Sequence, residues 1–135
     1  MANYVSICRS NYFKVQDEKR FIRWCAFWGL DHWTDTPDGL EGTFHAIANE
    51  NGDGWPSSHP ETGDDIDFEA ELQQQLLPET VAILVSADHE GLRFVGGHAC
   101  ALHADGRSEY ISLRSIQDKA RDVFGPDITI TEAIF

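Results

Sequence analysis

The chain has 135 residues, of which 41% are hydrophobic and 24% are charged, and these proportions are typical of one globular domain rather than of a disordered or fibrous chain. Asp and Glu number 23 and Lys and Arg number 10, which gives a formal net charge of −13. This balance argues against direct contact with nucleic acid or an anionic membrane, because both need clustered basic side chains.

The first elements predicted are a strand, a helix and a hairpin. Residues 4–15 are rich in β-branched and aromatic side chains, which favours a strand or a strand with a bend. A helix follows, with Asp17 as its N-cap and Gly29 as its end. Its apolar face has the spacing i, i+3, i+4, i+7 and consists of Phe21, Trp24, Cys25 and Trp28. The turn signal Asp35–Gly39 then predicts a hairpin over residues 30–48. One face of the hairpin's second strand consists of Phe44, Ala46 and Ala48.

The middle of the chain is predicted to hold a loop, a helix and a central strand. Gly, Asn, Asp, Pro and Ser dominate residues 49–62, which is typical of a loop. Asp65 or Asp67 caps the next helix, which Pro78 closes. One face of that helix has the spacing i, i+4, i+8 and consists of Phe68, Leu72 and Leu76. The short apolar run 80–86 is typical of a central strand.

Two more strands and a helix complete the predicted elements. A turn at residues 89–91 leads into a strand over 92–103, and a second turn at 104–106 leads into a strand over 109–113. Ser115 and Asp118 then resemble a capping box, with Asp in place of Glu. The apolar face of the helix behind them consists of Ile116, Ala120, Val123 and Phe124, and the helix stops at Gly125-Pro126. The segment after it, Ile128–Thr131, is expected to be a short edge strand or a tail.

The predicted order of elements is β-α-β-β-α-β-β-β-α. Hairpin turns dominate the connections, so we expect a single α+β domain over residues 1–135 with a largely antiparallel sheet and about three helices. No apolar run approaches the roughly 18–20 residues of a membrane span, and Met1–Ile7 lacks the features of a signal peptide. We therefore expect a cytoplasmic protein. Its three widely spaced cysteines, Cys8, Cys25 and Cys100, are predicted to be buried free thiols.

The negative charge is concentrated in the middle of the sequence. The 69 residues between Arg23 and Arg93 contain fifteen carboxylates and no Lys or Arg. If the predicted helix begins near Asp65, its acids form rows with about 5–6 Å between side-chain roots. Successive phosphates on a DNA strand have a similar spacing, so such rows could occupy a basic groove of another protein. Helix N-terminal acids are also stabilised by the helix dipole, but that effect does not explain the absence of basic residues over the whole stretch.

A partner-binding surface is therefore predicted in this acidic region, with a plain solvated acidic surface as the alternative. A tryptophan in the neighbouring loop either anchors the partner or packs back onto the core. The predicted partner-binding residues are Glu50, Asp53, Trp55, Asp64, Asp65, Asp67, Glu69 and Glu71.

Three clusters resemble metal sites, but we expect none of them to bind a metal. Asn49–Gly54 resembles the front half of a calcium loop, but Pro60 stands where a bidentate Glu is needed. His98, Cys100 and His103 suggest zinc, but strand alternation turns His103 to the other face. Asp64, Asp65 and Asp67 could serve as an acid–base or magnesium cluster, but no phosphate-binding glycine loop accompanies them. No cofactor or catalytic residue is predicted.

Two stretches resemble one known family. They are Ala2-Asn-Tyr, Cys8-Arg9, Asn11-Tyr-Phe and Val15 at the start, and Leu92–Ala99 through Ile111–Leu113 near the end. Together they resemble a family of small acidic proteins encoded on phages, plasmids and integrative elements. Through its genomic setting the resemblance implies an anti-CRISPR or antirestriction role. It carries over no catalytic residue and does not include the acidic middle.

The predicted function is non-enzymatic inhibition of a host nucleic-acid-directed defence complex, either a CRISPR effector or a restriction enzyme. The acidic face would bind a basic surface of that complex in the bacterial host, with no direct contact to nucleic acid or membrane. Two alternatives stay open. One is a small metal-dependent enzyme, and the other is a structural or regulatory module that assembles through Trp55 and the hairpin edges.

Overall fold

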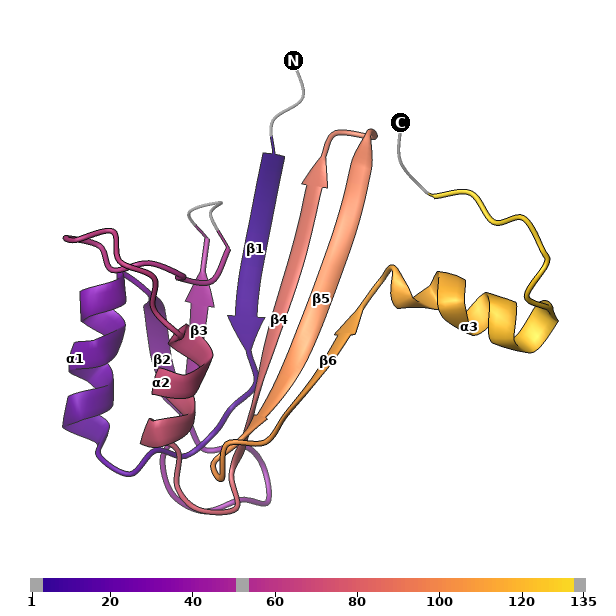
Figure 1. Cartoon of the computed structure of the whole chain (residues 1–135). Coiled ribbons are helices and arrows are strands. Elements are labelled where there is room, and N and C mark those ends of the chain that lie inside the picture. Colours follow the sequence, from indigo (N-terminus) through magenta and orange to yellow (C-terminus); the bar gives the residue numbers. More distant parts are fainter. Residues whose placement is uncertain (1–3, 51–53, 133–135) are drawn as a thin grey trace.

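The computed structural model describes residues 4–50 and 54–132. It is an α+β domain with one antiparallel sheet and three helices, in the predicted order (Figure 1). The strands lie in the order β2-β3-β1-β4-β5-β6. The elements are β1 (Tyr4–Ser10), α1 (Glu18–Trp28), β2 (Asp31–Asp35), β3 (Phe44–Asn49), α2 (Phe68–Gln75), β4 (Val81–Glu90), β5 (Phe94–His103), β6 (Ser108–Ser112) and α3 (Ser115–Phe124).

The helix α1 follows the sequence prediction closely. The Asp17 side chain accepts a hydrogen bond from the Arg20 amide at 3.1 Å, which caps the N-terminus. Gly29 ends the helix with a left-handed φ of 69°, a conformation that costs glycine little. Phe21 and Cys25 are fully buried, because the apolar face of α1 lies on the sheet.

The first segment is a strand with a bend, which is one of the two alternatives predicted for residues 4–15. β1 ends at Ser10, and the Asn11 side chain then continues the sheet's hydrogen bonding. Its Oδ1 accepts from the Ile83 amide at 2.8 Å, and its Nδ2 donates to the Val81 carbonyl at 3.2 Å. Two residues further on, Phe13 exchanges backbone hydrogen bonds with His45 of β3. β1 pairs with both β3 and β4, and beyond the bend the contact with β3 continues at Phe13.

The core lies on one face of the sheet, under α1 and α2. Both helices stand on the same side of β2, β3 and β1, while α3 leaves the opposite end of the sheet (Figure 1). A run of stacked rings joins the two helices: Trp24 lies 5.7 Å from Phe21 and 4.9 Å from Phe68, between ring centroids. The remaining buried hydrophobic residues of this cluster include Phe13, Ile47, Leu72, Leu76, Leu84 and Leu102.

The second helix is too short to align the predicted acids in rows, since that arrangement needed a helix from about residue 65. α2 begins at Phe68, and the Asp67 side chain caps it by accepting from the Ala70 amide at 3.0 Å. Asp65 is therefore not the cap, and the chain before Asp67 is a loop. The helix also ends at Gln75, before Pro78 is reached.

The β4–β5 hairpin is longer than predicted. β4 continues to Glu90, so the turn occupies residues 91–93 instead of 89–91. Although β4 is central in strand order, only one of its faces is covered, since both core helices lie on the same side. Ala82 and Leu84 are buried, whereas Val81 and Val85 are 39% and 46% exposed.

The start of α3 departs from the capping-box prediction. Ser115 is already inside the helix, and its hydroxyl donates to the Ser112 carbonyl at 2.6 Å. The N-cap position belongs to Arg114, which makes no side-chain capping bond. Residues 128–132 form an irregular tail and not an edge strand. Across the described part of the chain, the helices are too short and too polar to cross a membrane.

Candidate binding groove beside the acidic loop

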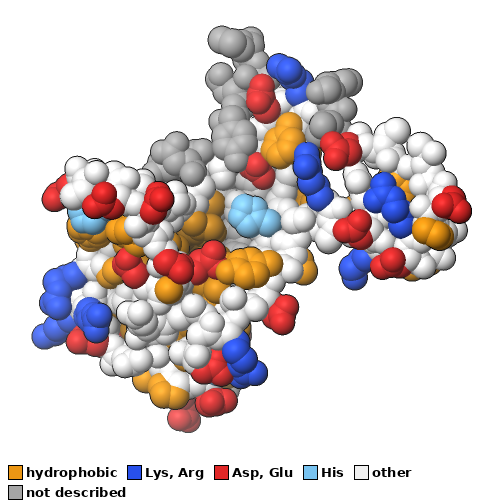
Figure 2. All heavy atoms as spheres, viewed as in Figure 1, with side chains coloured by type: hydrophobic (Ala, Val, Ile, Leu, Met, Phe, Trp, Pro, Cys, Tyr) orange, Lys and Arg blue, Asp and Glu red, His pale blue; other side chains and the backbone are white. Residues whose placement is uncertain are grey.

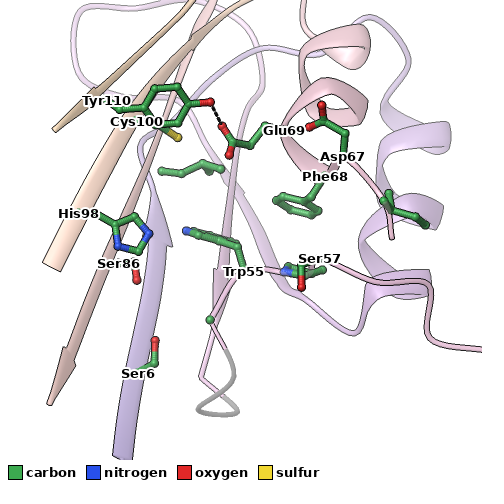
Figure 3. A pocket seen from close by; sticks show the side chains of 14 residues that line it. Ser6, Trp55, Ser57, Asp67, Phe68, Glu69, Ser86, His98, Cys100 and Tyr110 are labelled. Atoms are coloured by element: carbon green, nitrogen blue, oxygen red, sulfur yellow. Dashed lines mark hydrogen bonds between the residues drawn. The ribbon is translucent and has the colours of Figure 1, made fainter. Parts of the chain in front are cut away.

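A groove on the helix-covered face collects side chains from distant parts of the chain. Its volume is about 400 Å³, and it lies between residues 54–57, the start of α2 and strands β1, β4, β5 and β6 (Figure 3). The strand register sets its floor, because directly opposed residues of antiparallel strands point to the same face. Ser86 lies opposite His98, and Cys100 lies opposite both Leu84 and Tyr110.

Trp55 forms the wall of the groove on the loop side. Its ring stacks on Phe68, with 5.8 Å between centroids and 18° between planes. Of the two predicted roles, the structure therefore shows the packing onto the core, although Trp55 stays half-buried with one edge in the groove. Its indole nitrogen points across the groove toward the strands (Figure 3). That N–H is buried and has no hydrogen-bond partner among the described residues.

Glu69 forms the opposite wall and is tied to the strands. The Tyr110 hydroxyl donates to Glu69 Oε2 at 2.6 Å, the bond drawn dashed in Figure 3. This hydrogen bond raises the pKa of Tyr110 above its usual value. Burial, together with the negative charge of Glu69 and a hydrogen bond to it, raises the pKa of the Cys100 thiol to about 11.

These shifts make the groove better suited to binding than to nucleophilic chemistry. A cysteine attacks as the thiolate, and reactive cysteines have a lowered pKa. The pKa of Cys100 is shifted in the opposite direction, and its side chain is 8% exposed. The three thiols are free and buried, as predicted.

Exposed carboxylates gather beside this groove. Figure 2 shows Asp and Glu side chains over the loop before α2 and along α2, while Lys and Arg side chains gather at the N-terminal end of α1. Glu61, Asp64 and Asp65 are exposed on the loop, and Asp67 is exposed at the cap of α2. None of these four carboxylates forms an ion pair within residues 4–50 and 54–132.

His59 fixes the shape of this acidic loop, which we define as residues 59–67. Its ring Nδ1 accepts from the backbone amides of Glu61 and Thr62 at 3.1 and 3.2 Å. Its own backbone amide donates to the Asp64 carbonyl at 2.7 Å. The ring packs on Phe27 of α1, 5.2 Å between centroids. The carboxylates are therefore presented on a hydrogen-bonded loop, and not as a row along a helix.

The predicted acids divide into two groups. Glu71 accepts a hydrogen bond from the Trp24 indole at 2.9 Å, and Glu69 accepts one from Tyr110. Together with the capping Asp67, these acids have roles inside the fold. Asp64 and Asp65 have no such side-chain role, and Glu50 is exposed just after β3. Asp53, and Asn51 of the suspected calcium loop, lie outside the described residues.

The suspected zinc ligands are separated as strand alternation predicts. His98 and Cys100 lie on the groove face of β5, whereas His103 lies opposite Val81 on the other face. His103 instead contacts Asp105 at 3.0 Å. In the part of the chain that the structure describes, no three His, Cys, Asp or Glu side chains are grouped to hold a metal ion.

A second polar cluster, beneath α1, escaped the sequence analysis. His45 is 1% exposed, with its Nδ1 2.9 Å from His32 Nε2 and its Nε2 3.4 Å from Glu18 Oε1. This chain connects α1 to β2 and β3 through the core. Burial, reinforced by the neighbouring His45, lowers the pKa of His32 below its usual value.

Sequence reasoning also missed the strand residues of the groove. Ser86 and Tyr110 carry no motif, and their contribution depends on how β4, β5 and β6 pair. Period-2 alternation in the predicted strands was the signal that could have placed them on one face.

Comparison of the chain with protein-family models, with curated proteins and with solved structures finds no match.

Proposed function

We propose that this chain is a non-catalytic inhibitor encoded on a mobile genetic element. It acts in the cytoplasm of a bacterial host and binds a basic, nucleic-acid-binding surface of a defence complex, either a CRISPR effector or a restriction enzyme. The observation that carries this proposal is the acidic loop, whose exposed carboxylates are not paired with any basic side chain of the described chain.

A fixed acidic loop suits recognition of a basic partner. A loop whose backbone is already ordered loses less conformational freedom on binding, so more of the interaction energy appears as affinity. Opposite charge also speeds the encounter of the two proteins. The hydrogen bonds of His59 supply this order, since they hold Glu61 and Asp64 on the same short turn.

The groove supplies a place for one cationic side chain of the partner. An Arg or Lys side chain that enters it meets the carboxylates of Asp67 and Glu69 beside the rings of Trp55 and Tyr110. The carboxylates offer such a cation charge-assisted hydrogen bonds. A carbonyl oxygen beside that side chain can accept from the unpaired Trp55 indole, which relieves the cost of leaving a buried donor without a partner.

The test compares two triple variants with the same change in net charge. Glu61, Asp64 and Asp65 are each replaced by Lys in the first variant, because these exposed acids have no side-chain role in the fold. The control variant replaces Asp38, Glu41 and Glu79 by Lys, exposed acids in the β2–β3 and α2–β4 connections. Each is co-expressed with CRISPR effectors and restriction enzymes in bacteria challenged with a targeted plasmid.

We expect the parent chain and the control variant to restore plasmid transformation against one of these systems, and the acidic-loop variant to lose that ability. Binding of the purified complex should weaken steeply with salt, because exposed charge pairs are screened. Equal protection by both variants, or a salt-independent affinity, would remove the acidic loop from the mechanism. Protection against none of the systems would contradict the anti-defence function itself.

A further inference from the structure

The face of the sheet opposite α1 and α2 is apolar and open. On this face the strand register places Ile7 beside Ala87, Ile83 beside Ala101, and Ala99 between Val85 and Ile111. The exposed fractions are large for aliphatic side chains: Ile7 58%, Ile83 39%, Val85 46% and Ile111 70%. We call this region of β1, β4, β5 and β6 the open sheet face. Apolar side chains that are contiguous and exposed mark an interaction surface.

The open sheet face is nearly neutral, although the chain carries a net charge of −13. The charged side chains that the register places on it are one base, Arg9, and one acid, Glu109, within the described residues of these strands. Arg9 lies over the Trp33 ring, 4.8 Å from its centroid, and marks the border of the patch. A basic partner would gain little here, whereas a second copy of this acidic chain could approach without strong repulsion.

The helix α3 has an apolar stripe that stays largely exposed among the described residues. Ile116, Val123 and Phe124 are 64%, 76% and 71% exposed, and α3 buries no residue. An isolated helix of about ten residues is marginal in water, because most helical stability in proteins comes from packing an apolar face. Its charges cancel, since Asp118 and Asp122 balance Lys119 and Arg121.

We propose that α3 of one copy packs on the open sheet face of a second copy, and that the exchange is reciprocal in a two-fold symmetric dimer. Each copy then contributes one apolar helix and one apolar sheet face, and both are covered. A two-fold arrangement makes the two contacts identical, as in most soluble homodimers.

The link between β6 and α3 favours a partner's sheet over the helix's own. It is a short hydrogen-bonded turn in which the Leu113 amide donates to the Gly97 carbonyl at 2.9 Å and the Ser115 hydroxyl donates to Ser112. These bonds direct α3 away from the edge of its own sheet (Figure 1). Docking on a second copy leaves both hydrogen bonds and this direction of α3 unchanged.

The dimensions of the two surfaces agree. A helix of ten residues is about 15 Å long, and three inter-strand spacings across β1, β4, β5 and β6 amount to about 14 Å. An apolar notch of about 700 Å³ also lies between the sheet edge and α3, with Val95, Leu113 and Ile116 in its walls. His98 and Ser112 also line this notch, so part of it belongs to the helix-covered face and not to the open sheet face.

The test is the mass of the chain in solution, by light scattering over a range of concentrations. We expect the parent chain to be a dimer that dissociates on dilution. Ile111→Lys on the sheet face and Phe124→Glu on α3 should each weaken self-association by about 100-fold or more, since a symmetric dimer contains the substituted side chain twice and loses its apolar burial at both places. Leu92→Glu, at an 89% exposed turn position, is the matched control and should stay dimeric.

Mixing the two monomeric variants tests which surfaces meet. The Ile111→Lys chain keeps an intact α3, and the Phe124→Glu chain keeps an intact sheet face, so their mixture should form heterodimers with one of the two contacts. Circular dichroism checks that each variant is folded, and Val85→Lys replaces Ile111→Lys if that variant unfolds. A parent chain that is monomeric at every concentration would overturn the proposal. So would a Phe124→Glu variant that dimerises like the parent, or a mixture without heterodimers.

Discussion

The helices α1 and α3 have similar patterns in the sequence and different surroundings in the structure. Each has about ten residues with an apolar face at helical spacing. α1 is capped by Asp17 and Gly29 and buries Phe21 and Cys25 on the sheet, whereas α3 has no side-chain cap and buries nothing. The comparison teaches that an amphipathic pattern predicts a helix that needs a partner surface, but does not say which surface.

The largest expected effect separates the two apolar faces. Phe21→Ala should lower the free energy of unfolding by about 3–5 kcal/mol, because it leaves a cavity in a packed core. Phe124→Ala should change it by less than about 0.5 kcal/mol in dilute solution, since its ring is 71% exposed. Urea unfolding at low protein concentration measures both. If the two substitutions lowered the free energy of unfolding equally, α3 would be packed within its own copy.

Thiol labelling sharpens the same contrast. Burial raises the pKa of Cys25 on α1 to about 12, so almost none of it is thiolate at neutral pH. Together with burial, this shift should slow the reaction of Cys25 with a disulfide reagent by about 100-fold or more relative to an ordinary exposed thiol. In a Val123→Cys variant the new cysteine on α3 should react at the ordinary rate in dilute solution.

The control for this labelling is the protein unfolded in urea, in which every thiol should react quickly. Raising the concentration of the folded variant should slow the labelling of the residue 123 thiol if α3 docks on a second copy. Fast labelling of Cys25 in the folded protein would contradict the burial of that face of α1.

The parts of the fold that local chemistry determines were predicted well from the sequence. The caps of α1, the Asp35–Gly39 turn and the order of the elements follow from residues a few positions apart. The start of α2 stayed open between Asp65 and Asp67 because either could serve as the cap, and tertiary packing selects Asp67. The core residues Phe21 and Leu72 were within reach because each belongs to an apolar face at helical spacing in its own helix.

The candidate site was predictable only in part. Trp55 was singled out because a large ring in a Gly- and Pro-containing loop is hard to bury, and Asp64 and Asp65 because they belong to a long stretch without Lys or Arg, although they were expected on a helix and lie on a loop. The groove's floor was not, because Ser86 and Tyr110 meet only through a strand register that the sequence does not specify. The open sheet face was missed because the apolar run of β4 has the composition of a strand buried on both sides.

Helix capping gives a smaller effect with the same contrast. Asp17→Ala should lower the free energy of unfolding by about 1 kcal/mol, because the Arg20 amide loses its acceptor. Arg114→Ala should leave it nearly unchanged, since Arg114 makes no capping bond at the start of α3. Thermal and urea unfolding of the two variants measure the difference. A loss at Arg114 as large as at Asp17 would mean that its side chain stabilises α3 in some other way.

The smallest expected effect concerns pH and the polar chain beneath α1. The lowered pKa of His32 means that the unfolded chain binds a proton at this residue more readily than the folded chain does. The free energy of unfolding should therefore fall as the pH drops below about 6.5, the ordinary pKa of His, and level off below the lowered value. His32→Gln should remove this part of the pH dependence, and His89→Gln, at an exposed position on β4, should leave it intact. Urea unfolding on both sides of that pH makes the comparison. If the free energy of unfolding of the His32→Gln variant falls with pH as much as that of the parent, other groups cause the fall. The His32–His45–Glu18 chain would then not link α1 to acid stability.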